Sequence, residues 1–418
     1  MTTTLCRYLA VSETCESKRG GGRVQIVYVI GRYWPATGGG PLQTRELAIR
    51  IARDENVTVV ALCNTSAPNA YSEHNVSKPS PGEEYQDERV CVKIVERKPW
   101  QCALLRLPLL GVPRFRIARG AWKYLFQRFI ASWIVENVHS ASLIHNVQVG
   151  PDALTWGAFT ASRILKIPFV HTPYLHPSYN PGWLVRIYRQ SDAIVAMTER
   201  ERERLISWGV APQRVHAIGA GPILSPVQVD GKEWREKMGI RGSVVLFVGR
   251  KTAYKGCAHL LEAAEYVWRV QPDVYFVFAG PTYEDVKEAF DRRQDKRIIN
   301  LPPVEGEEKA EIYRACDIFC MPSAEESLGS AYLEAWSCKK PVIACDIPAL
   351  REVVEPGADG LLVRQDAKEI ACAIICLLEN KELRERMGEA GYKKVTTKYS
   401  WDNIAAKMRS LYSSLVGK

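Results

Sequence analysis

The strongest constraint on the fold is an alternation of short apolar runs with segments of helical periodicity, which occurs twice along the chain. From Arg23 onward the runs are VQIVYVIG, ELAIRIAR and VTVVALC, and the order restarts after Gly242 with SVVLFVGR, HLLEAAEYVWRV and VYFVFAG. Strands that read as continuous apolar runs are buried on both faces, as in parallel sheets covered by helices. The pattern predicts an α/β fold with two doubly wound, Rossmann-like sheets.

The length of the chain fits two domains. Its 418 residues exceed one ordinary core, and the Gly- and Pro-rich stretch GAGPILSPVQVDGKEW predicts a boundary near residue 224. A last helix, with Trp401, Ile404, Met408 and Leu411 at helical spacing, is expected to pack back toward the first domain. The expected parts are a flexible extension, a first domain, a second domain and this helix, over residues 1–22, 23–223, 224–398 and 399–418.

Composition favours a cytoplasmic protein. Hydrophobic residues make up 46% and charged residues 25% of the chain, and no apolar run approaches the roughly 18 residues that cross a bilayer. The first twenty residues lack the long apolar segment of a secretory signal. The 12 cysteines are scattered and several lie in apolar runs, which predicts buried, reduced thiols and no zinc site. The net charge of +9 suits an anionic ligand or membrane surface, but no nucleic-acid-binding motif is present.

The second half contains a basic loop directly after a predicted strand. In VVLFVGRKTAYKG, Arg250 offers a bidentate fork and Lys255 a point charge, and both could hold a diphosphate. Neither a P-loop nor a GxGxxG pattern occurs here. A solvated basic loop is the alternative interpretation.

The stretch PSAEESLGSAYLEAW combines acids with a helix start. Leu328-Gly329-Ser330-Ala331 should begin a helix, whose first N–H groups and dipole favour an anion. Glu326 and Glu334 would flank that anion as acceptors for sugar hydroxyls. The combination predicts a nucleotide-sugar site, and an amphipathic helix with solvated acids is the alternative.

Taken together, these segments resemble the donor-site signature of retaining glycosyltransferases of the GT-B fold, family 4. The resemblance rests on Arg250 and Lys255 and on the Glu326 to Glu334 pair, and it covers nearly the whole chain from about Arg23. It includes TGGGPLQTRELA, SDAIVAMTERERERL, AEIYRACDIFCMPS and SWDNIAAKM. It implies two Rossmann-like domains facing across a cleft, with acceptor bound by the first and nucleotide-sugar donor by the second.

The resemblance also implies a role for each matching residue. Arg250 and Lys255 would bind the donor diphosphate and stabilise the leaving nucleotide, Glu334 would bind the ribose hydroxyls and Glu326 the sugar. The amides of Gly329, Ser330 and Ala331 would meet the sugar or phosphate, and the loop Gly38-Gly39-Gly40 would close over the donor, although glycines also serve a simple turn. No metal or other cofactor is implied, because the two cations and the helix dipole take its place.

The family also has a histidine near the reacting sugar, in a segment that corresponds here to IPFVHTPYLHPSYN. We choose His176, which lies in the loop past the predicted strand, over His171, which lies inside the apolar run. Tyr174 follows Thr172-Pro173 and departs from one common form of the family pattern. His145 is a third candidate.

The segment Arg106 to Val138 permits two interpretations. Trp122, Phe126, Phe129 and Trp133 repeat at helical spacing among basic residues. They predict either a helix that packs its aromatic face into the core, which we prefer, or a contact with anionic lipid or a lipid-linked acceptor.

The sequence as a whole predicts a retaining glycosyltransferase. It would move a hexose-type sugar from a UDP- or GDP-sugar to a hydroxyl on a glycan, a lipid-linked acceptor or a small molecule. A nucleotide-sugar epimerase of the same architecture and a non-catalytic sugar-nucleotide-binding protein are the alternatives.

Overall fold

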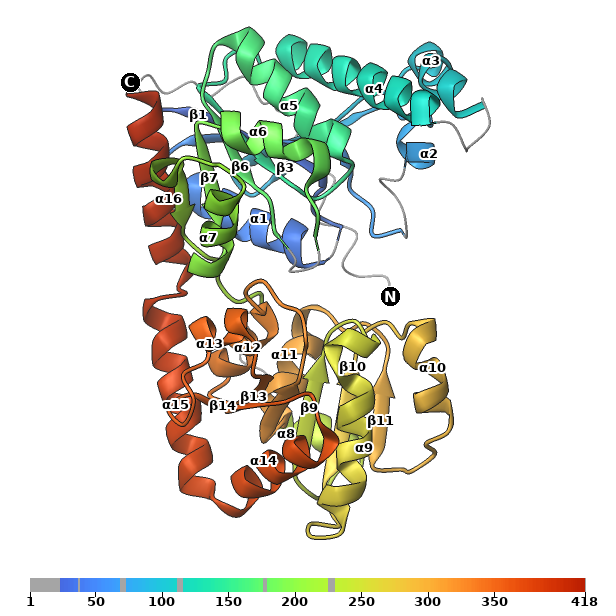
Figure 1. Ribbon diagram of the computed structural model, residues 1–418, viewed down its shortest axis with the longest axis vertical. Helices are drawn as coiled ribbons and strands as arrows, with labels where there is room; N and C mark the ends of the chain where they lie inside the picture. The colour runs from blue at the N-terminus through green and yellow to red at the C-terminus, as the bar shows by residue number, and fades with distance from the viewer. Residues whose placement is uncertain are drawn as a thin grey trace. The chain divides into compact units, whose positions relative to one another are not determined.

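The computed structural model describes residues 23–36, 38–67, 73–110, 116–175, 179–224 and 230–417 (Figure 1). The chain packs as two compact units. One unit ends at Phe169 and also takes in the residues from Ser414 on, and the other is Val170–Ser413. The predicted α/β class with two doubly wound sheets is confirmed.

The first sheet has eight strands in the order β3-β4-β2-β1-β5-β6-β7-β8. Its strands are β1 (Gln25–Arg32), β2 (Asn56–Cys63), β3 (Glu83–Asp87), β4 (Val90–Ile94), β5 (Leu143–Val147), β6 (Phe169–Thr172), β7 (Ala193–Ala196) and β8 (Val215–Ala217). β1 pairs in parallel with β2 and with β5, so that Ile26 lies opposite Val57 and Leu143. Residues Ile26 to Ile30 are fully buried, as expected of a central parallel strand.

Strand β3 differs from the predicted parallel pattern. It pairs antiparallel with β4, and its sequence EEYQD is mostly exposed. A short, charged strand at the edge of a sheet discourages pairing with another chain. The polar composition of β3 follows from this edge position.

Helices and short 3-10 segments connect the strands of the first sheet. They are α1 (Gly39–Ile51), α2 (Glu73–Val76), α3 (Pro99–Leu110), α4 (Arg116–Asn137), α5 (Asp152–Leu165), η2 (Gly182–Leu184), α6 (Val185–Gln190), α7 (Glu199–Ser207) and η3 (Pro212–Arg214). Trp122 and Phe126 of α4 are fully buried and stack with ring centroids 5.0 Å apart. Burial of each such side chain contributes roughly 1.5–3 kcal/mol. The preferred core interpretation of this aromatic stripe is correct for these two residues, whereas Phe129 and Trp133 are only half-buried.

The second sheet has six strands in the order β11-β10-β9-β12-β13-β14. They are β9 (Val244–Val248), β10 (Tyr275–Ala279), β11 (Ile298–Leu301), β12 (Ile318–Met321), β13 (Val342–Cys345) and β14 (Gly360–Val363), and every neighbouring pair is parallel. In chain order this is 3-2-1-4-5-6, the order of a Rossmann sheet. β9 and β12 are adjacent, with Leu246 opposite Phe319.

The helices and 3-10 turn of the second half are α8 (Gly231–Lys237), η4 (Ala253–Lys255), α9 (Cys257–Trp268), α10 (Glu284–Asp291), α11 (Gly306–Ala315), α12 (Ser330–Ser337), α13 (Pro348–Val353), α14 (Ala367–Glu379), α15 (Lys381–Thr397) and α16 (Trp401–Val416). Trp401, Ile404, Met408 and Leu411 of α16 are buried, as their spacing predicts. Cys320 and Cys345 are buried and free, as predicted from their apolar runs, whereas Cys372 and Cys376 are free but exposed, unlike the predicted buried thiols.

The division of the chain can be drawn at two places. β8 ends at Ala217 and β9 begins at Val244, so the two sheets separate around the predicted boundary near residue 224. The compact units instead divide inside β6, after Phe169. Across the described residues, no helix is both long and apolar enough to span a membrane.

Candidate functional site

The point where strand order reverses in the second sheet lies between β9 and β12. The connection from β9 runs toward β10 on one side, and β13 follows β12 on the other. In open α/β sheets such a reversal leaves a crevice at the carboxyl ends of the two strands, where ligands bind. The predicted basic loop follows β9 and the predicted acidic loop follows β12, so the topology alone brings the two predicted motifs to one edge.

Lys255 and Glu326 form a buried ion pair at this edge. Lys255 Nζ donates to Glu326 Oε1 although the residues are 71 positions apart, and the two side chains are only 10% and 7% exposed. Removing two charges from water carries a desolvation penalty, so a buried ion pair is weak evidence that it stabilises the fold. It is stronger evidence that these charged groups have a function at this position.

Gly256 allows the two loops to approach each other. Its φ of +77° is in the left-handed region, and a Cβ at this position would lie 2.3 Å from the Pro322 carbonyl oxygen. Beside it, the Tyr254 carbonyl accepts hydrogen bonds from the Ala324 amide at 2.8 Å and from Gln365 Nε2 at 3.0 Å. A glycine is therefore required where the loop after β9 meets the loop after β12.

Arg250 is the exposed member of the predicted cation pair. Its Nη2 donates to the Tyr254 hydroxyl at 2.7 Å, and its guanidinium lies 5.9 Å from the centroid of the same ring. Lys255 Nζ lies 5.4 Å from that centroid. Tyr254 thus lies close to both cations, and sequence reasoning missed it.

Helix α12 begins where it was predicted. Gly329 precedes it with φ +73°, in the left-handed region, and Ser330 and Ala331 are its first two residues. A Cβ on Gly329 would lie 2.5 Å from the Tyr332 ring, so glycine is required here for space as well as for conformation.

Glu334 lies in the second turn of α12 and is 3% exposed. Its Oε1 accepts from Lys309 Nζ at 2.5 Å, and its Oε2 accepts from the Tyr313 hydroxyl at 2.8 Å. Burial and the neighbouring Glu334 carboxylate raise the pKa of Tyr313 well above its usual value, so this hydroxyl stays protonated and donates. Sequence reasoning missed Lys309 and Tyr313, whose i, i+4 spacing on α11 was the available signal.

A second buried carboxylate, Glu201, was also missed. Its Oε1 accepts from the Leu175 amide at 2.6 Å and its Oε2 from the Met197 amide at 2.5 Å. Full burial raises its pKa to about 7, against the lowering effect of these two amides. The buried Ser327 hydroxyl, which follows Glu326 in the acidic loop, also lowers the pKa of Glu201 by hydrogen bonding, although less than the two amides do. The signal was the capping pattern Thr198-x-x-Glu201 at the start of α7.

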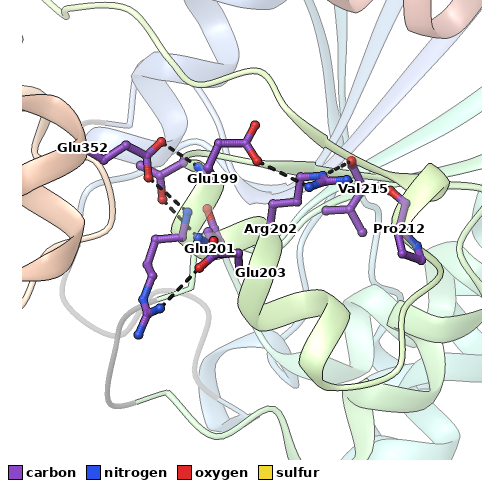
Figure 2. A network of polar contacts seen from close by, with 9 residues as sticks. Glu199, Glu201, Arg202, Glu203, Pro212, Val215 and Glu352 are labelled. Carbon is purple, nitrogen blue, oxygen red and sulfur yellow. Dashed lines mark hydrogen bonds and ion pairs between the residues drawn. The ribbon is translucent and has the colours of Figure 1, made fainter.

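The start of α7 is completed from a distant part of the chain. Glu352 of α13 accepts the amides of Glu199 at 2.7 Å and Arg200 at 3.0 Å, as Figure 2 shows. Thr198 Oγ1 accepts the Glu201 amide at 3.2 Å. A carboxylate at a helix N-terminus satisfies amides that have no partner inside the helix and also interacts favourably with the helix dipole.

The three histidine candidates fall in different places. His171 is fully buried in β6 and stacks on Tyr188 with ring centroids 5.3 Å apart. His145 is 1% exposed in β5, 5.1 Å from the Tyr28 ring. His176, the preferred candidate, lies outside the described residues, two positions after Tyr174, whose φ of +49° is unusual for a residue other than glycine.

The predicted loop Gly38-Gly39-Gly40 is only in part a loop. Gly38 has φ +119° and precedes α1, whereas Gly39 and Gly40 are its first two residues. Only Gly38 of the three glycines therefore lies in the turn. Gly39 and Gly40 lie in the first turn of α1, where the backbone amides have no acceptor within the helix.

The sequence matches known families over most of its length. Residues 230–394 match the family described as Glycosyl transferases group 1, and residues 38–221 match the Glycosyl transferase 4-like domain. The chain belongs to the group 1 glycosyl transferases. The two matches leave only residues 222–229 between them, so the family resemblance drawn from Arg250, Lys255, Glu326 and Glu334 is confirmed.

Curated relatives of this chain are named for several transferase activities. The chain is 32% identical to the D-inositol 3-phosphate glycosyltransferase of Xylanimonas cellulosilytica, over 54% of this chain and 58% of that protein. It is 27% identical to the alpha-D-kanosaminyltransferase of Streptomyces kanamyceticus, over 74% of this chain and 88% of that protein. The chain thus spans little more than half of the first of these relatives.

Solved structures share the fold. The structure of Anabaena HepE in complex with UDP-glucose superposes with a TM-score of 0.69 over 94% of this chain and 100% of that one, at 19% identity. The sucrose-phosphate synthase of Thermosynechococcus elongatus gives a TM-score of 0.67 at 20% identity, over 94% of this chain and 100% of that one. The group 1 chain therefore has the GT-B fold, with two Rossmann-like domains.

Proposed function

We propose that the protein transfers a hexose-type sugar from a nucleotide diphosphate sugar to a hydroxyl acceptor, with retention at the anomeric carbon. The observation that carries this proposal is the meeting of Arg250, Lys255 and Glu326 at the strand-order reversal of the second sheet, next to the start of α12. Cations, a carboxylate and a helix N-terminus at one crevice match the charges of a diphosphate and the hydroxyls of a sugar.

In this proposal the cations act on the leaving group. Negative charge grows on the diphosphate as the glycosidic bond breaks, and fixed cations stabilise that charge. Lys255 can do this without losing Glu326, because an ammonium has three N–H donors and the ion pair occupies one. Arg250 would leave the Tyr254 hydroxyl, or share it, to form a bidentate contact with phosphate oxygens. No metal or other cofactor is part of this proposal.

The carboxylates orient the hydroxyls of the donor. A carboxylate has about four acceptor positions, and Lys309 and Tyr313 occupy two of those on Glu334. The remainder are proposed to accept the ribose hydroxyls, while Glu326 accepts a hydroxyl of the sugar. The amides of Gly329, Ser330 and Ala331 are proposed to bind the sugar or phosphate. His176 remains our candidate beside the reacting carbon, and Gly38, Gly39 and Gly40 our candidates for closure over the donor.

The names of similar proteins support proposals for the donor and for the acceptor. HepE was solved with UDP-glucose, which supports a UDP-sugar over a GDP-sugar. A relative named for D-inositol 3-phosphate supports a small polyol phosphate as one acceptor, beside glycans and lipid-linked hydroxyls. We also propose a cytoplasmic location, since the ten cysteines within the described residues are all free, as in a reducing compartment.

The test is direct assay of binding and turnover. Thermal shifts with UDP, GDP, UDP-glucose and GDP-mannose identify the donor base, and incubation of the bound sugar nucleotide with acceptors shows transfer, with the anomeric configuration read by NMR. We expect a product glycoside whose configuration matches the donor. An isomerised sugar nucleotide without transfer would instead establish the epimerase, and binding without any turnover across acceptor classes would establish the non-catalytic binder.

A further inference from the structure

A group of large apolar side chains is exposed on two neighbouring helices, α3 and α4. Of the nine such side chains exposed among the described residues, five lie on these two helices. We call this group the α3–α4 surface; it consists of Trp100 (61% exposed), Leu104 (49%), Leu107 (61%), Tyr124 (60%) and Leu125 (38%). Scattered apolar residues on a protein surface are ordinary, but a concentration of this kind indicates an interaction site.

Helix α3 presents an apolar face outward. Trp100, Leu104 and Leu107 are spaced i, i+4, i+7 and so share one face, while Cys102 and Leu105 on the other face are 1% and 2% exposed. A surface helix normally directs its apolar face to the core and its polar face to solvent. α3 is apolar on both faces, so its outer face is a candidate interaction surface.

Helix α4 lies beside α3, and it adds charge to this surface (Figure 1). Trp122, Phe126 and Ile130 face the core, fully buried. On the outer side, Arg128 is exposed and shares a face with Tyr124 and Leu125, four and three positions before it. The core interpretation of α4 therefore accounts for one face of the helix only.

The charge of this segment has one sign. Residues 97–135 contain no aspartate or glutamate, and their basic residues are Arg97, Lys98, Arg106, Arg114, Arg116, Arg119, Lys123 and Arg128. Arg97 is buried, where it donates to the Leu62 carbonyl at 2.9 Å, whereas Lys98 and Arg106 are exposed. Aromatic and leucine side chains among exposed cations, without acids, are the composition of a helix that lies in the interface of an anionic bilayer.

We propose that the α3–α4 surface binds the headgroup region of an anionic lipid membrane. Trp100, Leu104 and Leu107 would enter the boundary between headgroups and acyl chains, and the exposed Lys98 and Arg128 would lie near lipid phosphates. A protein partner would be expected to bring acids to match these cations, but an anionic bilayer matches the apolar and basic parts together. The residues of this surface do not belong to the donor site, so the proposal stands apart from the proposed transfer reaction.

The experiment is vesicle flotation of the full-length protein, with phosphatidylcholine alone or mixed with phosphatidylserine. We expect binding to the mixed vesicles only, and a decrease in binding as salt is raised. The variant W100S/L104S/L107S should lower the partition coefficient at least about tenfold, and K98Q/R128Q should lower it at low salt. The control V270S/Y283S removes two other exposed apolar side chains, which are 51% and 45% exposed, and should bind like the parent.

Two further readouts make the result decisive. Nucleotide binding and circular dichroism of each variant establish that it is folded, since these exposed side chains do not support the core. Equal binding to neutral and anionic vesicles, no binding by the parent at low salt, or unchanged binding by W100S/L104S/L107S would overturn the proposal. A concentration-dependent dimer in analytical ultracentrifugation that this variant abolishes would assign the surface to a second copy of the chain instead.

Discussion

Breaking the buried Lys255–Glu326 pair should separate the stability of the second sheet from its capacity to bind phosphate. In Lys255→Met the Glu326 carboxylate, on a side chain only 7% exposed, loses its cation. Removing one partner of a buried pair typically costs about 3–5 kcal/mol, because the remaining charge stays desolvated. In K255M/E326L both charges are gone, and the expected cost falls to within about 1 kcal/mol of the parent.

The two quantities are measured separately. Urea unfolding followed by tryptophan fluorescence gives the stability of each variant, with the transitions of the two units fitted independently. Calorimetry with UDP and with GDP gives nucleotide affinity, which should fall about ten- to a hundredfold in both the single and the double variant, since both lack the ammonium.

A matched control comes from an exposed ion pair. Lys339 and Glu389 lie 2.8 Å apart with side chains 54% and 60% exposed, and Lys339→Met should leave the urea midpoint and the nucleotide affinity unchanged. The reasoning is refuted if Lys255→Met is as stable as the parent, or if K255M/E326L is as unstable as the single variant. Full nucleotide affinity in the double variant would remove Lys255 from the phosphate site.

Four other substitutions test residues of the site. Glu334→Gln should weaken nucleotide binding by roughly 1–3 kcal/mol, whereas Tyr313→Phe should cost stability but leave calorimetric affinity nearly unchanged; equal affinities in Glu334→Gln and the parent would exclude the ribose role. Glu201 has a folded pKa of about 7, above that of an unfolded glutamate, so its contribution to stability is complete below about pH 4 and is lost as pH rises through 7. The stability of the parent relative to Glu201→Gln should therefore fall by roughly 2–4 kcal/mol between pH 4 and 8; a relative stability that does not change with pH in urea unfolding would refute the raised pKa. Gly256→Ala should abolish nucleotide binding, because its Cβ meets the Pro322 carbonyl at 2.3 Å and left-handed backbone costs about 1–2 kcal/mol more with a side chain; retained affinity would show that the loops need not meet.

The sheets were predictable because burial on both faces leaves an uninterrupted apolar run, and strand order then fixes which loops become neighbours. The motifs of the two loops and the family resemblance predicted one nucleotide-sugar site, and the observed strand order explains why the loops after β9 and β12 are neighbours. The antiparallel pairing of β3 could not be predicted, since EEYQD has no apolar run and its direction is set by its neighbour β4.

The supporting residues of the site were missed for a different reason. Lys309 and Tyr313 bind Glu334 across 25 and 21 positions, and Glu201 binds a backbone amide 26 positions away. Periodicity reports which face of an element is apolar, and it carries no information about which distant polar group a side chain reaches. His176 stays a prediction of the sequence, outside the described residues.

The capping of α7 by Glu352 has a consequence for the order in which the protein forms during synthesis. The amides of Glu199 and Arg200 have no acceptor within their own helix and donate to a carboxylate that the ribosome adds 153 and 152 residues later. A nine-residue helix is marginal by itself. On the nascent chain these two amides of α7 should therefore stay without this cap until α13 has emerged, by which point most of the second sheet has been made.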